Sequence, residues 1–178
     1  GFYAAYSLTT GSKNVAFGQS ALEGCTDGIN NVAIGYETGT ADWADHNVAV
    51  GYRALKLNTS DNNTAIGAFA LDANTTGNAN SALGYSSLTG NTTGLRNTAV
   101  GYAALSSNTT GNYNVAVGYD ALGDADGSNN TAVGNDALCK LTTGGNNVAM
   151  GINALDACTT GGSNTAIGGF ALDNNTTA

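Results

Sequence analysis

The chain has 178 residues, of which 26 are glycine and none is proline, and its formal net charge is −8. Only 10% of the residues are charged, against about 25% in an average soluble domain. The chain has no basic stripe and no apolar run of about 18 residues, which argues against nucleic-acid binding and against a membrane-spanning segment.

A pentapeptide of the form Asn-(Val/Thr/Ser)-Ala-apolar-Gly recurs ten times, at steps of 16 or 17 residues. A fixed period of this kind predicts a stacked array in which each repeat is one turn. We therefore predict an all-β parallel β-solenoid of about ten turns, with 16–17 residues per turn. The structural anchors of the repeat are Asn14, Asn31, Asn47, Asn63, Asn80, Asn97, Asn114, Asn130, Asn147 and Asn164, and Gly18, Gly35, Gly51, Gly67, Gly84, Gly101, Gly118, Gly134, Gly151 and Gly168.

The array is expected to form a single unit over residues 1–178. Gly1 is in phase with the anchor glycines but lacks the pentapeptide before it, and the chain stops at Ala178 before the next asparagine is due. We therefore expect a segment of a longer fibre, cut within a repeat at both ends.

Two short strands are predicted in each turn, because frequent glycines and clustered β-branched residues disfavour a helix. The first covers Asn-x-Ala-apolar-Gly-Tyr, as at residues 97–102, and the second surrounds Ala-Leu, as at Ala104 and Leu105. The residue before the anchor glycine is apolar in all ten copies, from Phe17 to Ile167. It is therefore expected to point into the coil.

The alanine and glycine of each pentapeptide would then lie on the opposite face of the strand. Residues this small indicate that another backbone approaches closely. We predict that this face packs against a neighbouring chain, while the alternative is a coil interior too narrow for anything larger than alanine. The interface candidates are Ala33, Ala49, Ala65, Ala99, Ala116 and Ala132.

The repeated polar residues are expected to form the corners of the coil. The anchor asparagine tolerates left-handed geometry, and its amide is expected to bond nearby backbone and the amides of adjacent turns. The recurring Thr-Thr-Gly predicts the other corner. Asn-x-Ser/Thr triplets at Asn74, Asn91 and Asn108 follow from this turn consensus and would carry glycans only in a eukaryotic secretory route.

Two repeats depart from the pattern. The second contains the only tryptophan, Trp43, and the only histidine, His46, which indicates a variant turn with a surface tryptophan or, as an alternative, a binding site. The segment 123–129 resembles part of a calcium loop, with Asp124, Asp126 and Asn129 as candidate oxygen ligands, but it lacks the expected bidentate glutamate. A solvated turn is the competing interpretation.

The remaining chemistry points away from catalysis. Cys25, Cys139 and Cys158 do not form a disulfide framework, because the last two lie out of register by two positions, beyond the usual reach of a disulfide. They are interpreted as buried or half-buried thiols, with an inter-chain bridge as the alternative. No nucleophile elbow, phosphate loop or Cys-x-x-Cys motif is present, so we predict neither an enzyme nor a cofactor.

Asn-Val-Ala-Ile-Gly at 31–35 and Asn-Thr-Ala-Val-Gly at 97–101 resemble the YadA-like head repeats of trimeric autotransporter adhesins. The longer unit Gly-Tyr-x-Ala-Leu-x-x-Asn-Thr-Thr-Gly is similar to repeat arrays of phage tail fibres and other surface fibres. The resemblance covers nearly all of residues 14–172, although the adhesin head repeat is shorter. It implies a left-handed β-roll, a homotrimer and a role in attachment.

From this the sequence predicts a structural or adhesive segment of an extracellular or viral fibre. Its partners would be copies of itself and a host-surface, matrix or glycan ligand. One alternative is a self-assembling filament subunit, because open solenoid ends can template further turns. Another is an ice-binding solenoid, which is disfavoured because adjacent threonines of a strand face opposite sides.

Overall fold

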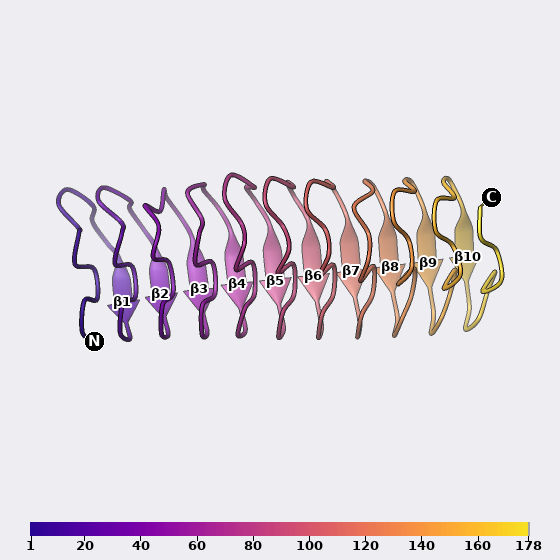
Figure 1. The fold of residues 1–178 in the computed structure, drawn as a ribbon, viewed down its shortest axis with the longest axis horizontal. Helices are drawn as coiled ribbons and strands as arrows, with labels where there is room; N and C mark the ends of the chain where they lie inside the picture. Colours follow the sequence, from indigo (N-terminus) through magenta and orange to yellow (C-terminus); the bar gives the residue numbers. More distant parts are fainter. Residues whose placement is uncertain (178) are drawn as a thin grey trace.

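The computed structural model describes residues 1–177, which form a rod of stacked coils with the two termini at opposite ends (Figure 1). Ten parallel strands wind through about nine turns of about 17 residues, and no helix occurs among the described residues. The predicted all-β parallel solenoid is therefore confirmed. The strands are β1 (Val15–Phe17), β2 (Val32–Ile34), β3 (Val48–Val50), β4 (Thr64–Ile66), β5 (Ser81–Leu83), β6 (Thr98–Val100), β7 (Val115–Val117), β8 (Thr131–Val133), β9 (Val148–Met150) and β10 (Thr165–Ile167).

The strands pair in chain order, from β1 to β10, in one sheet. Each central alanine pairs with the central alanine of the next turn, whether that turn has 16 residues, as between Ala33 and Ala49, or 17, as between Ala82 and Ala99. The difference in turn length is therefore absorbed outside the strands, and the sheet keeps one register along the rod.

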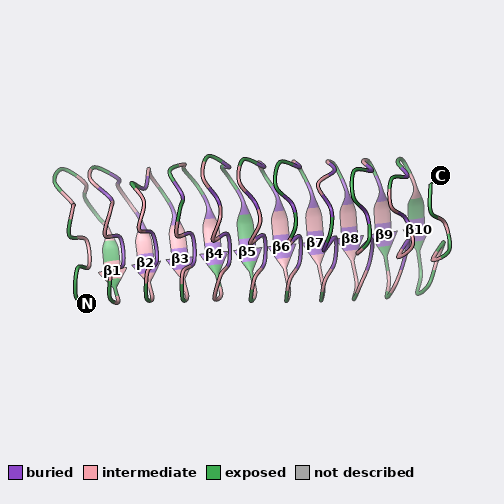
Figure 2. Cartoon of the chain, viewed as in Figure 1, coloured by how far each residue is buried: buried purple, intermediate pink, exposed green. Residues whose placement is uncertain are grey.

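The central alanine of each strand points into the coil, and the two flanking residues point out. Figure 2 shows this pattern along the inner strands, whose flanking residues are half-buried or exposed. The predicted orientation of the strand is therefore wrong: the apolar residue before each anchor glycine faces outward. The proposed interface alanines are fully buried within the chain itself, namely Ala33, Ala49, Ala65, Ala99, Ala116 and Ala132.

The reason is the width of the coil. The central alanine faces a second chain segment that contributes both an alanine and a leucine to the core, and Ala104 and Leu105 are both fully buried. Little room remains for a larger side chain on the strand. The alanines therefore lie in the coil interior, where the alternative interpretation places them.

This second segment is not the predicted strand but a run of turns. Its φ angles alternate in sign, and both Ala103 and Leu105 have φ of 53°. Adjacent side chains of a strand would face opposite sides, whereas this alternation allows Ala104 and Leu105 to be buried together. The left-handed conformation costs roughly 1–2 kcal/mol per residue. It is offset by leucine burial and by hydrogen bonds from Ala103 N to Tyr85 O and from Leu105 N to Ala121 O, both 3.0 Å long.

The anchor asparagines bond backbone as predicted. Asn97 N donates to Asn80 Oδ1 at 2.9 Å, and Asn97 Nδ2 donates to Gly111 O at 2.8 Å. Direct bonds between the amides of anchor asparagines are confined to the last turns, as from Asn147 Nδ2 to Asn130 Oδ1. The expected ladder therefore runs mainly through alternating side-chain and backbone groups.

A second, true amide ladder lies inside the coil. The Nδ2 atoms of Asn74, Asn91 and Asn108 each donate to Oδ1 of the asparagine one turn earlier, at 2.6–2.8 Å. All three side chains are fully buried. The Asn-x-Thr triplets are therefore structural in this fold, and a glycan on their buried amides would be incompatible with it.

Candidate interaction surface

The outward side of the sheet forms a long uncharged surface, which we call the sheet face. It consists of two columns of side chains, one on each side of the buried alanines. Leu83 is 49% exposed and Ile66 is 39% exposed. The first column contains Val15, Val32, Val48, Thr64, Ser81, Thr98, Val115, Thr131, Val148 and Thr165, and the second, the apolar column, contains Phe17, Ile34, Val50, Ile66, Leu83, Val100, Val117, Val133, Met150 and Ile167.

The sheet face is uncharged but not uniformly apolar, because five of the ten residues in the first column are threonine or serine. The apolar column, in contrast, is apolar in all ten strands, and large exposed apolar patches mark interaction sites. Neither column contains a charged residue. The regular register extends this surface along all ten strands.

A second surface feature is a row of stacked aromatic rings just beyond the anchor glycines. Ring centroids are 5.6 Å apart between Tyr36 and Tyr52, 5.3 Å between Tyr85 and Tyr102, and 5.2 Å between Tyr102 and Tyr119. In all three pairs the rings are close to parallel, with interplanar angles of 6–11°. We call this row the aromatic column, and its members are Tyr36, Tyr52, Phe69, Tyr85, Tyr102 and Tyr119.

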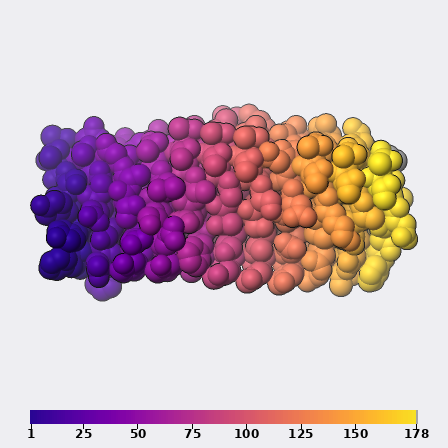
Figure 3. All heavy atoms as spheres, in the orientation of Figure 1, coloured from indigo at the N-terminus to yellow at the C-terminus, as the bar shows by residue number. Residues whose placement is uncertain are grey.

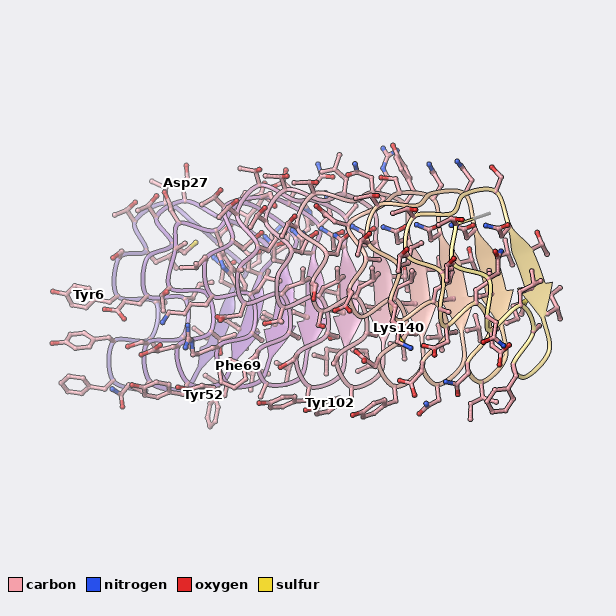
Figure 4. The ribbon with its side chains drawn as sticks, turned by 45° about the vertical axis from the view of Figure 1, so that its right-hand side comes forward. Tyr6, Asp27, Tyr52, Phe69, Tyr102 and Lys140 are labelled. Atoms are coloured by element: carbon pink, nitrogen blue, oxygen red, sulfur yellow. The ribbon has the colours of Figure 1, made fainter. Side chains whose placement is uncertain are left out.

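Phe69 keeps the row continuous where the consensus tyrosine is replaced by Ala68. It comes from the next position along the chain and contacts Tyr52 and Tyr85 edge-on, at 5.1 and 5.8 Å. Figure 4 shows Tyr52, Phe69 and Tyr102 along one edge of the rod. The Arg53 guanidinium lies 5.6 Å from the Phe69 centroid, a cation–π arrangement.

Ion pairs between successive turns flank this edge. Lys56 Nζ lies 2.6 Å from Glu37 Oε2, and Arg53 Nη2 lies 3.3 Å from Asp72 Oδ2. The hydrogen bond from Lys56 lowers the pKa of Glu37. The charge of Glu37 in turn raises the pKa of the Tyr36 phenol. These surface pairs orient side chains around the aromatic column, but such pairs contribute little to stability.

The rest of the described surface has no concave site. No pocket opens within residues 1–177, and the face seen in Figure 3 is an even array of side chains along the rod. The described residues contain no helix that is long and apolar enough to cross a membrane. The geometry therefore offers extended surfaces rather than an enclosed site.

Trp43 is fully buried in the core, so the prediction of a surface tryptophan is wrong. Its Nε1 donates to Leu55 O at 3.0 Å. Gly39 occupies the place of the consensus leucine in this turn, and a Cβ added there would overlap the indole ring. Trp43 thus fills from another direction the space that leucine fills elsewhere. His46 lies at the surface, with Nε2 3.1 Å from Asn30 Nδ2, and does not form a site with Trp43.

The calcium candidates do not form a ligand cage. The Asp126 carboxylate is engaged by the preceding turn, whereas Asp124 and Asn129 are exposed. Among the described residues, no three His, Cys, Asp or Glu side chains are grouped so that they could hold a metal ion. The carboxylate and amide oxygens that suggested a calcium loop are instead distributed around a tight turn.

Asp126 replaces a backbone carbonyl that its 16-residue turn lacks. In 17-residue turns a threonine carbonyl accepts hydrogen bonds from the previous turn, as from Thr92 N to Thr109 O. Here Asp126 Oδ1 accepts from the backbone N atoms of Thr109, Thr110 and Gly111, at 2.7–3.0 Å. Partial burial acts to raise the pKa of Asp126, but the hydrogen bonds from Thr110, Thr109 and Gly111 outweigh it and hold the pKa below 3.8.

We expect Asp126→Asn to destabilise the fold by about 2 kcal/mol at pH 7, because charge-assisted hydrogen bonds are lost. A carboxylate with a lowered pKa stabilises the fold above its unfolded-state pKa, and this contribution disappears as the pH falls through the folded-state pKa. The difference in urea midpoint between wild type and variant should therefore shrink as the pH falls below 3.8. Asp124→Asn, at an exposed neighbouring position, is the control. An equal effect of both variants would contradict this role.

The three cysteines are free thiols, as predicted, with Cys25 and Cys158 buried and Cys139 half-buried. Cys139 Sγ donates to Asp156 Oδ1 at 2.8 Å. Burial and this carboxylate raise the pKa of Cys139 to about 12. The thiolate is the reactive form, and this raised pKa disfavours it at neutral pH.

No known protein family, curated protein or solved structure matches this chain. The aromatic column was missed at the level of sequence, although its signal was present: a tyrosine follows the anchor glycine in five turns, which places successive rings one turn apart.

Proposed function

We propose that this chain is a structural and adhesive segment of an extracellular or viral fibre that mediates attachment to a surface. The observation that supports this role best is the uncharged sheet face, which runs along a rod in which residues 1–177 form no pocket. A rod spans distance, and its repeated turns display one surface many times. Multivalent display of this kind raises avidity without strong individual contacts.

We further propose that copies of the chain associate through the sheet face as a homotrimer. The apolar column, rather than the buried alanines, then supplies the contact. A second copy is a fitting partner because its side chains repeat at the same inter-strand spacing, about 4.8 Å in β-sheets. Burying the exposed parts of Leu83 and its neighbours in the apolar column would supply the hydrophobic driving force.

Light scattering on wild type and on Leu83→Lys tests this interface. Wild type is expected to have the mass of three chains. An unpaired lysine in an apolar contact costs several kcal/mol, so the variant should weaken association by about a hundredfold, or about 2.7 kcal/mol. Circular dichroism should show an unchanged fold, because the Leu83 side chain points outward.

Leu57→Lys is the matched control, because Leu57 is 46% exposed but lies outside the sheet face. It should leave the mass unchanged. A wild-type chain that is monomeric at all concentrations would overturn the proposed interface. Polymers that grow with concentration would favour the filament alternative over a closed trimer.

A further inference from the structure

The aromatic column places tyrosines of successive turns in contact while leaving their edges in solvent. Tyr85, Tyr102 and Tyr119 are 48%, 51% and 54% exposed. Their ring centroids are 5.2–5.3 Å apart and their planes are nearly parallel. The residues lie 17 positions apart in sequence, so each contact joins two turns of the coil.

We propose that the aromatic column is a modification site, at which a peroxide-driven one-electron oxidant joins tyrosines of successive turns as dityrosine. Each of two phenols loses one electron and its hydroxyl proton and becomes a phenoxyl radical. Hydrogen peroxide accepts the two electrons and two protons, its O–O bond breaks, and two waters form. The radicals form a carbon–carbon bond between their Cε atoms, and each Cε proton moves to the oxygen to restore the phenol.

The geometry favours this coupling over competing reactions. Two phenoxyl radicals must normally meet by diffusion, whereas the column holds its tyrosines as preformed neighbours and raises their effective concentration. The torsion about Cβ–Cγ of an aromatic residue is broad, so an exposed ring can rotate to bring its Cε atom toward the next ring. The product is a covalent link along the axis of the rod.

Phe69 divides the column into two reactive runs. It has no phenol, and it separates Tyr52 from Tyr85 with edge-on contacts on both sides. Coupling is therefore expected within the pair Tyr36 and Tyr52 and within the run from Tyr85 to Tyr119, but not across Phe69.

One of these links joins two different tryptic peptides, although the second of them contains Tyr113 and Tyr119 as well as Tyr102, so variants are needed to assign the partner of Tyr85. After oxidation by hydrogen peroxide and a haem peroxidase, the chain would be unfolded in denaturant and digested with trypsin. Cleavage after Lys56, Arg96 and Lys140 places Tyr85 in peptide 57–96 and Tyr102 in peptide 97–140. Mass spectrometry should detect these two peptides joined, two hydrogens lighter than their sum, together with dityrosine fluorescence.

Tyr102→Phe should reduce the joined peptide by about tenfold or more, because Tyr85 then has no tyrosine neighbour within contact distance. The phenyl ring preserves stacking, so the fold should be unaffected. Tyr113→Phe is the matched control: Tyr113 is 50% exposed and lies in the same tryptic peptide. Its ring contacts the Arg96 guanidinium rather than another tyrosine, and its loss should leave the yield unchanged.

Equal yields of the joined peptide from Tyr102→Phe and wild type would overturn the proposal. So would products that are mainly dimers of chains on a denaturing gel, at rates that rise with protein concentration. Coupling within the aromatic column requires only one folded chain. A monomeric protein that still forms the link would refute the trimer and support the modification site.

Discussion

Replacing Gly101 by alanine is expected to destabilise the rod by about 3–5 kcal/mol, as the sum of backbone strain and lost hydrogen bonds between turns. Gly101 has φ of 136°, in a region that is essentially reserved for glycine. An added Cβ would also overlap the carbonyl oxygen of Gly118 in the next turn. The two turns would have to separate, which weakens bonds such as Gly118 N to Val100 O at 2.8 Å.

Gly168→Ala separates the two contributions. Gly168 has a similar φ of 124°, but a Cβ added there meets no atom within 4 Å. It should therefore cost only the backbone strain, about 1–3 kcal/mol. Urea unfolding followed by circular dichroism measures both variants. Equal losses of stability would show that the close approach of the turns is not the constraint on Gly101.

The repeat made the architecture predictable, because ten copies at a fixed step admit few folds other than stacked turns. The small residues were also correctly taken to indicate a close backbone approach. At Gly101 that backbone is the next turn of the same chain. Which chain supplies the close contact could not be decided from period and residue size alone.

The orientation of the strands could not be derived from hydrophobicity. Val100 is larger and more apolar than Ala99, and the usual argument places the larger side chain inside. The argument fails because the neighbouring segment buries Ala104 and Leu105 side by side. That arrangement depends on the positive φ of Leu105. Leucine adopts this conformation rarely, and the residue pattern does not predict it.

The second turn shows why its departure from the repeat was misinterpreted. A tryptophan in an irregular, polar stretch is typical of a surface loop, but Trp43 compensates for a leucine that is absent four residues earlier, at Gly39. Glycine at position 39 alone would leave the core underfilled, and tryptophan at position 43 alone would overfill it. The two residues must therefore be considered as a pair. Only the structure shows that the Trp43 indole lies over Gly39.

Trp43→Ala is accordingly expected to cost about 3–5 kcal/mol, as for large aromatic residues removed from a core, and it leaves Leu55 O without its indole donor. Gly39→Leu alone should also destabilise, because the new side chain would overlap Trp43. The double variant Gly39→Leu, Trp43→Thr restores the consensus arrangement. Leucines at the equivalent position of other turns, such as Leu55 and Leu71, already have φ of 53° and 51°, close to the 63° of Gly39.

The double variant should therefore be more stable than either Gly39→Leu or Trp43→Thr alone, with a coupling energy of about 0.5–3 kcal/mol, the range found for residues in direct contact. Urea unfolding of the wild type, the two single variants and the double variant gives the four free energies of unfolding from which this coupling energy is calculated. Because Trp43 is the only tryptophan, its fluorescence also reports directly on burial in the wild type. Additive losses would mean that the two residues act independently and that the tryptophan does not replace the missing leucine.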